Sequence, residues 1–257
     1  RHGMEAKFRQ INQFLEILEP LVATLPGKAE RELRLVDMGC GKGYLTFAAC
    51  RHLERAGWTL AARGIEARAE LVEHCNRVAG DHAFGALHVE CGTIESAAIG
   101  PVDVLLALHA CDTATDDAIA KGIQAGASLI LTAPCCHHEI RPQLRPPPAL
   151  AGAFKHGILR ERQAEWVTDA LRAALLEWAG YETKVFEFIA TEHIVVKVVV
   201  HLANITVMPQ VHQAVDTINQ RHFPPAHGFK AHPFFLPLLP CPQDELTTAH
   251  FLSRFTG

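Results

Sequence analysis

The chain has 257 residues, of which 49% are hydrophobic and 20% charged, and its formal net charge is −4. This length and balance are typical of one large globular domain, and the sequence holds no run of about 18 apolar residues that could span a membrane. The negative charge excludes a protein-wide basic surface for nucleic acid but leaves room for a local basic patch.

The cysteines and the first residue add further expectations. Eight cysteines are scattered through apolar and loop positions of a long chain, which is typical of reduced thiols and not of a disulfide framework. We therefore expect a cytoplasmic protein, by default a monomer, with no membrane partner. The chain begins with Arg1 and not with methionine, which indicates a fragment or a processed product.

Helix and strand patterns alternate along the first 200 residues or so. Helices are expected at 8–25, 44–55, 71–79, 115–124 and 161–179, and strands at 33–36, 59–65, 86–90, 102–108, 128–132, 184–189 and 194–200. Continuous apolar strands separated by helices predict an α/β fold, with a parallel sheet covered by helices on both faces. The last two strands are joined by too few residues for a parallel crossover, so they should pair antiparallel.

The pattern divides the chain into three parts. Residues 1–30 form an N-terminal helical segment, 31–201 the α/β domain, and 202–257 a C-terminal extension. The extension is rich in proline, histidine and aromatic residues, and its pattern predicts no fold.

A glycine-rich segment follows the first predicted strand, where the chain turns into the next helix. Its sequence is Asp37-Met38-Gly39-Cys40-Gly41-Lys42-Gly43-Tyr44. Glycines here let the backbone turn tightly and approach a ligand, because no Cβ atom stands in the way. The spacing differs from the Gly-x-Gly-x-x-Gly of dinucleotide-binding enzymes, and Asp37 would repel a phosphate while it suits the amino group of an amino acid. A simple turn without a ligand is the alternative explanation.

Glu66 lies at the predicted end of the second strand, where a carboxylate can accept both hydroxyls of a ribose. Asp37, the glycines and Glu66 together resemble motif I of the class I S-adenosylmethionine-dependent methyltransferases. The resemblance implies a Rossmann-like, seven-stranded sheet with an antiparallel last strand pair, and S-adenosylmethionine as the cofactor. It assigns cofactor contacts to Asp37, Gly39, Cys40, Gly41, Gly43, Tyr44, Glu66, Gly92, Thr93 and Leu108.

The end of the fourth strand carries a second group of polar side chains. His109 and Asp112 lie nearest the strand and are candidates for the substrate side of the site, because open α/β sheets bind ligands at the carboxyl ends of their strands. Asp116 and Asp117 have an equally good structural explanation, since acids in the first turn of a helix complement its dipole.

The fifth strand is followed by Pro134-Cys135-Cys136-His137-His138. Four consecutive ligands cannot all converge on one ion, because neighbouring side chains diverge, so we predict no zinc site from this segment alone. One cysteine and one histidine could still join distant ligands. The alternatives are small buried thiols beside a loop, and side chains that position a nucleophile or take its proton. The candidate catalytic residues are His109, Asp112, Cys135, Cys136 and His137.

Four segments resemble one branch of the methyltransferases more closely. They are Lys-Phe-Arg-Gln-Ile-Asn at 7–12, Gly-Lys-Gly-Tyr-Leu-Thr-Phe at 41–47, His-Ala-Cys-Asp-Thr-Ala-Thr-Asp at 109–116 and Pro-Cys-Cys-His-His at 134–138. This branch includes tRNA ribose 2′-O-methyltransferases, so the resemblance implies RNA, either tRNA or rRNA, as the partner. One departure weakens the substrate assignment: Ile194-Val195-Val196-Lys197 stands where the branch often continues with a polar Lys/Arg-Asn step.

A local basic patch also favours RNA. Residues 141–162 hold five Lys or Arg and one acid, Glu161, where a phosphate backbone could be bound, although a solvated charged loop would look the same. Transfer to a ribose hydroxyl needs only alignment or a base, whereas transfer to a pyrimidine carbon would add a cysteine to the ring. We favour in-line transfer, with the cysteines shaping the pocket. The rival functions are methylation of a protein or small molecule, and an inactive methyltransferase-like scaffold.

Overall fold

The computed structural model of the chain describes residues 2–26, 31–108, 110–191 and 194–203. The helices are α1 (His2–Ala23), α2 (Tyr44–Arg55), α3 (Ala69–Asp81), α4 (Thr113–Gln124), α5 (Ala151–Phe154) and α6 (Gly157–Trp178), with a 3₁₀ turn over Pro148–Leu150. The strands are β1 (Leu33–Met38), β2 (Leu60–Glu66), β3 (Leu87–Cys91), β4 (Val104–Ala107), β5 (Leu129–Thr132), β6 (Tyr181–Thr191) and β7 (Ile194–Ala203).

These strands form one sheet in the order β3-β2-β1-β4-β5-β7-β6. The first five strands, β1 to β5, are parallel to one another. In contrast, β7 runs antiparallel to both β5 and β6. The antiparallel pairing of the last two strands therefore agrees with the short connection between them. The strand order reverses between β1 and β4, which is where open α/β sheets bind their ligands.

Alternate side chains of the strands enter two hydrophobic layers, one on each face of the sheet. Leu35 of β1 packs with residues of α1, α2 and α3, whereas its neighbour Val36 packs with residues of α4 and the end of α6. This two-residue alternation is what a parallel strand with helices on both faces requires.

The helix α1 is part of the first of these layers. Phe14, Leu18 and Leu21 are fully buried in it, which explains the apolar spacing that the sequence shows. The packing of α1 matters for function, because it brings the first half of the helix over the carboxyl ends of the strands.

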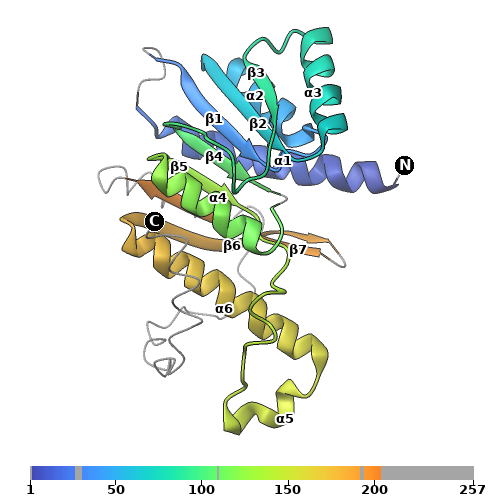
Figure 1. Cartoon of the computed structure of the whole chain (residues 1–257), viewed down its shortest axis with the longest axis vertical. Helices are drawn as coiled ribbons and strands as arrows, with labels where there is room; N and C mark the ends of the chain where they lie inside the picture. The colour runs from blue at the N-terminus through green and yellow to red at the C-terminus, as the bar shows by residue number, and fades with distance from the viewer. Residues whose placement is uncertain (1, 27–30, 109, 192–193, 204–257) are drawn as a thin grey trace, which may run out of the picture.

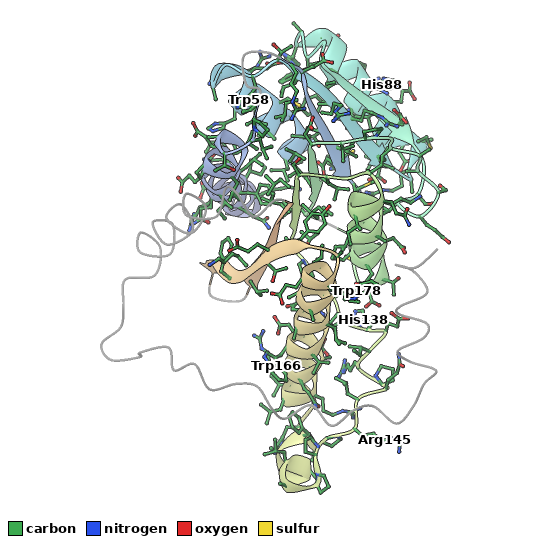
Figure 2. All side chains as sticks on the ribbon, turned by 90° about the vertical axis from the view of Figure 1, so that its left-hand side faces the viewer. Trp58, His88, His138, Arg145, Trp166 and Trp178 are labelled. Carbon is green, nitrogen blue, oxygen red and sulfur yellow. The ribbon has the colours of Figure 1, made fainter. Side chains whose placement is uncertain are left out.

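An arm extends away from the sheet, and we define it as residues 139–166. Figure 1 shows α5 and the first turns of α6 at the lower end of the molecule, beyond the strands. Arg145 and Trp166 both lie on this arm (Figure 2), and Trp166 is 63% exposed. The helix α5 and the 3₁₀ turn are absent from the sequence prediction because their mostly exposed residues show no apolar period.

Element ends differ from the predicted ones by a few residues. The strand predicted at 102–108 is shorter, since its ladder begins at Val104, and α6 begins at Gly157 instead of residue 161. Of the predicted C-terminal extension, residues 202 and 203 belong to β7, and 204–257 lie outside the described residues. Among the described helices, none combines the length and the apolar character that a membrane crossing needs.

Candidate active site

A cleft of about 680 Å³ lies at the carboxyl ends of β1 to β4. Its walls come from the glycine-rich loop after β1, the segments after β2, β3 and β4, and the first half of α1. Pockets for small ligands and cofactors typically measure about 300–1,000 Å³. The cleft therefore has the place and the size of a cofactor site.

The glycine-rich loop needs its glycines for backbone geometry. Gly39, Gly41 and Gly43 have φ angles of 73°, 60° and 70°, in the left-handed region that other residues adopt only with strain. Gly39 and Gly41 line the cleft, but Gly43 does not. A Cβ at Gly43 would lie 2.8 Å from the ring of Phe47, so this glycine serves the turn into α2 and its packing.

Asp37 is a buried acid at the end of β1 that also lines the cleft. Its side chain is 3% exposed, and the Thr46 hydroxyl donates a hydrogen bond of 2.5 Å to Oδ2. Burial raises the pKa of Asp37 to about 6, although the hydrogen bond from Thr46 lowers it in part. A cation in the cleft would stabilise the ionised form of this carboxylate.

Glu66 ends β2 with both carboxylate oxygens hydrogen-bonded. Oε1 accepts from the backbone N–H of Arg68 at 3.0 Å and from its Nε at 2.7 Å. Oε2 accepts from the backbone N–H of Gly41 at 2.9 Å and from Nη2 of Arg68 at 3.2 Å. Burial raises the pKa of Glu66, but the hydrogen bonds and charge of Arg68 together with the Gly41 N–H bring it below its ordinary value. Glu66 is therefore an ionised acceptor at neutral pH.

The cleft gathers nine of the ten predicted cofactor contacts. These are Asp37, Gly39, Cys40, Gly41, Tyr44, Glu66, Gly92, Thr93 and Leu108. The structure adds Lys7 and Gln10 of α1 and Cys111 after β4, which the sequence prediction did not assign to the cofactor. The Lys7 Nζ lies 4.6 Å from the centroid of the Tyr44 ring. The helical spacing of α1 shows which face is buried, but it does not show what the other residues of the helix approach.

Asp112, a predicted catalytic residue, connects the loop after β4 to the loop after β5. Its side chain accepts hydrogen bonds from the backbone N–H of Glu139 at 3.1 and 3.3 Å, and it does not line the cleft. Its backbone angles, φ 54° and ψ −123°, are strained for a residue with a side chain and cost about 1–3 kcal/mol. Asp112 thus holds the loop after β5 against the start of α4.

Asp116 has a different role from the one that its sequence position indicates. Its side chain is 2% exposed and accepts from Nε of the fully buried Arg172 at 2.7 Å. Arg172 also donates to the backbone carbonyl of Asp112 at 3.0 Å and lies 3.5 Å from Asp169. This buried network, and not the helix dipole alone, accounts for Asp116. Its neighbour Asp117 lines the cleft.

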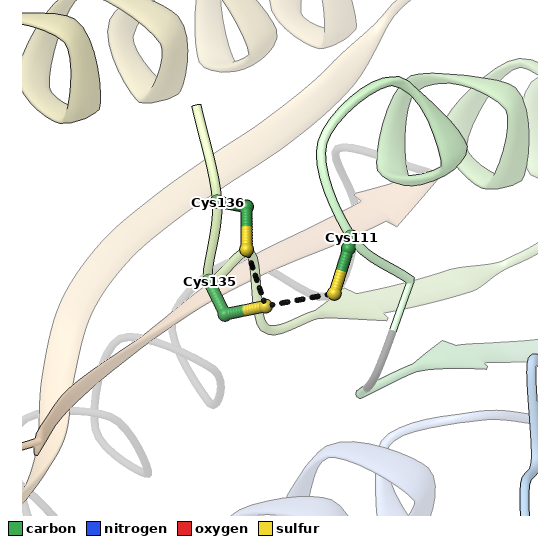
Figure 3. Close-up of side chains that lie close together, drawn as sticks. All are labelled: Cys111, Cys135 and Cys136. Carbon is green, nitrogen blue, oxygen red and sulfur yellow. Dashed lines mark hydrogen bonds between the residues drawn. The ribbon is translucent and has the colours of Figure 1, made fainter. Parts of the chain in front are cut away.

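Cys111, Cys135 and Cys136 meet beside the cleft (Figure 3). The Cys135 Sγ lies 3.2 Å from that of Cys111 and 3.5 Å from that of Cys136. Of the three, only Cys111 lines the cleft. Partial desolvation and the adjacent thiols raise the pKa of Cys135, although the residue is exposed, so its reactive thiolate form is disfavoured at neutral pH.

Of the two predicted catalytic histidines, the structure describes one. His137 directly follows this group of cysteines and is buried, with 4% of its surface exposed. It does not line the cleft. His109 lies outside the described residues.

Comparison with solved structures shows the fold. The CMeT domain of the citrinin polyketide synthase matches with a TM-score of 0.51 and 18% identity, over 76% of this chain and 52% of that one. This chain thus spans about half the length of that structure. An rRNA methylase from Streptococcus thermophilus matches at 10% identity and a TM-score of 0.45, over 72% of this chain and 92% of that one. At these identities the likeness concerns the fold alone.

Sequence comparison identifies the family. No curated protein matches the chain. The model of a family described as "Methyltransferase domain" matches residues 6–143, which is more than half of the chain. The matched residues include most of α1, the glycine-rich loop, Glu66 and the cysteine pair after β5. The chain therefore belongs to the methyltransferase domain family.

Proposed function

We propose that this enzyme transfers a methyl group from S-adenosylmethionine to RNA. One observation carries the cofactor assignment: a buried carboxylate at the end of β1 and an ionised carboxylate at the end of β2 line the same glycine-walled cleft. Two acids placed this way suit a ligand with a cationic amine at one end and a ribose at the other.

The residues of the cleft fit the parts of this cofactor. Asp37 would accept hydrogen bonds from the amine of the methionine moiety, and Glu66 from the ribose hydroxyls. No phosphate needs to be held, which agrees with an acid beside the glycine loop. When bound, the cofactor supplies an electrophilic methyl group. The chain's own residues bind it, orient it and hold the acceptor in line with the methyl group.

Arg68 competes with the ribose for Glu66, because it already donates three hydrogen bonds to the Glu66 carboxylate. We expect Arg68→Ala to strengthen S-adenosylmethionine binding by about two- to fivefold, since the exposed ion pair that the ribose displaces is weak. Titration calorimetry measures the change, with Arg77→Ala, an exposed arginine of α3, as the matched control. Weaker binding in Arg68→Ala would mean that this arginine contacts the cofactor instead.

The arm supports RNA as the acceptor. Of its cations, Arg141 pairs with Glu161 and Arg162 with Glu165, both at 2.7 Å. Arg145, Lys155 and Arg160 have no ion-pair partner within the part of the chain that the structure describes.

Lys155 and Arg160 line a groove of about 210 Å³ together with Phe154. Unpaired cations beside a partly exposed aromatic ring are what a single-stranded phosphate backbone and its bases need. The exposed Trp166 on the same arm adds a further aromatic surface.

The finer proposal is in-line transfer to a ribose 2′-hydroxyl of tRNA or rRNA. It is supported by the sequence resemblance to the branch with the Pro-Cys-Cys-His-His motif. The raised pKa of Cys135 also favours it over a covalent route through a cysteine, which needs a thiolate. The cysteines that the structure describes are free thiols, which supports the proposed cytoplasmic location.

His137 is proposed to position the acceptor, because it directly follows Cys136, whose thiol lies near that of the cleft-lining Cys111. We expect His137→Ala to lower kcat at least about tenfold while the affinity for S-adenosylmethionine stays within about twofold. His138→Ala, which changes the exposed neighbour, is the control. Loss of cofactor affinity in His137→Ala would place this histidine on the cofactor side.

Transfer of a labelled methyl group from S-adenosylmethionine into RNA, protein and small-molecule fractions of a cell extract tests the acceptor. We expect label in RNA, and nucleoside digestion should place it on ribose.

The double variant Lys155→Glu/Arg160→Glu should lose at least about tenfold in RNA affinity, and its RNA affinity should depend less steeply on salt concentration, with cofactor binding unchanged. The control Arg55→Glu/Arg77→Glu makes the same charge change on exposed residues of α2 and α3. Label in protein or small molecules would overturn the RNA assignment, and no label despite cofactor binding would favour an inactive scaffold.

A further inference from the structure

The loops after β4 and β5 bring three thiols together although they come from distant parts of the sequence. Cys111 precedes α4, and Cys135 and Cys136 follow β5 (Figure 3). All three Sγ atoms lie within 4.8 Å of one another. The proposed methyl transfer uses none of these thiols as a nucleophile, so their convergence is unexplained by it.

The spacing of the sulfur atoms matches a metal centre. A zinc ion holds thiolates at about 2.3 Å in a tetrahedron, so its sulfur ligands lie roughly 3.8 Å apart. The Sγ atom of Cys135 lies 3.2 Å from that of Cys111 and 3.5 Å from that of Cys136, a few tenths of an ångström below that value, and the third pair lies within 4.8 Å. Small rotations of the cysteine side chains would bring the sulfurs towards the tetrahedral spacing.

The surroundings favour an anionic metal–thiolate group. The thiols lie beside the first residues of α4, where the helix dipole favours negative charge. The nearest described carboxylate of the loop, on Asp112, is already engaged with the Glu139 N–H. Cys111 and Cys135 are exposed, so an ion can reach them from solvent.

We propose that Cys111, Cys135 and Cys136 bind one Zn²⁺ ion, with a fourth coordination position left open beside the cleft. Binding releases the three thiol protons to solvent and involves no redox step. The ion would fix the loop after β4 to the loop after β5, next to the cofactor. Two adjacent cysteines can serve this ion because the distant Cys111, and not the following histidines, supplies the third ligand.

The full chain, expressed with added zinc and purified under reducing conditions, tests the site by elemental analysis. We expect about one zinc ion per chain in the wild type and in Cys91→Ser, which removes an exposed cysteine at the end of β3. Each of Cys111→Ser, Cys135→Ser and Cys136→Ser should weaken zinc affinity at least about tenfold. The triple serine variant should lose the ion, and equal zinc content in it would overturn the proposal.

A second test uses only the reduced, metal-free wild type, so its result does not depend on how the variants fold. The protein is titrated with cobalt, which replaces zinc as a spectroscopic probe. We expect a sulfur-to-cobalt charge-transfer band that saturates at one equivalent and disappears when zinc is added. Absence of this band would overturn the proposal. So would a Cys111–Cys135 disulfide found by non-reducing peptide mapping of protein purified with zinc and without added reductant, because bound thiolates would be protected from oxidation.

Discussion

Asp37→Asn is expected to weaken S-adenosylmethionine binding at least tenfold, which corresponds to about 1.4 kcal/mol. The carboxylate is buried at the cleft, where its charge attracts the amine of the cofactor with little screening by water. Asparagine keeps the size of the side chain but removes the charge. Titration calorimetry at pH 8 measures the loss, and Asp81→Asn, an exposed acid at the end of α3, is the control. Affinity within twofold of wild type would contradict the role of Asp37.

The pH dependence of stability tests the same residue in the absence of a ligand. Burial raises the pKa of Asp37 from its ordinary value of 3.8 to about 6, so the folded state binds a proton that the unfolded state has already lost. The contribution of Asp37 to stability is therefore complete below about pH 4 and falls as pH rises to about 6.

Denaturant titrations from pH 4 to 7 should show that this fall is present in wild type and missing in Asp37→Asn. Cofactor affinity of the wild type should rise over the same pH interval, because the amine binds the ionised carboxylate. Identical stability profiles of the two proteins would mean that Asp37 titrates at its ordinary value.

Arg172→Ala is expected to lower the free energy of unfolding by about 3–5 kcal/mol. The guanidinium is fully buried, and it donates to Asp116 at 2.7 Å and to the carbonyl of Asp112 at 3.0 Å. Its removal leaves the carboxylate of Asp116 buried without its counter-charge. It also frees the backbone of a strained residue that joins the two substrate-side loops.

Chemical denaturation measures this change, with Arg77→Ala as the control for losing an exposed arginine. The variant Arg172→Met separates the effect of charge from that of packing, because methionine fills much of the volume of the arginine side chain without its charge. A similar loss of stability in Arg172→Met and Arg172→Ala would attribute the effect to the missing charge. A loss below about 1 kcal/mol in Arg172→Ala would contradict the proposed importance of the buried network.

The local features of this fold could be predicted from the sequence. Apolar runs mark the strands of the sheet, and helical spacing gives α2 its bounds of Tyr44–Arg55. The short link between the last two strands indicates their antiparallel pairing. The glycine loop and Glu66 follow from the strand–turn–helix context, because parallel strands bring their carboxyl ends to one edge.

Contacts between distant segments could not be predicted in this way. Asp116 and Arg172 are 56 positions apart, so nothing near Asp116 indicates that it is buried with a partner. Cys111 and Cys135 are 24 positions apart, so the sequence around Cys135 and Cys136 gives no sign that the Cys111 thiol lies beside them. Glu66 is predicted as a site residue, but its hydrogen bonds with Arg68 depend on a side-chain geometry that spacing does not encode.

The most direct test of the proposed cofactor site is the equilibrium binding of S-adenosylmethionine to wild type and to Glu66→Ala. We expect one site per chain in the wild type and an affinity at least tenfold lower in the variant, since the ribose hydroxyls lose their acceptor. Circular dichroism and thermal unfolding establish that the variant is folded. No binding to the wild type, or unchanged affinity in folded Glu66→Ala, would contradict the claim that this cleft holds the cofactor.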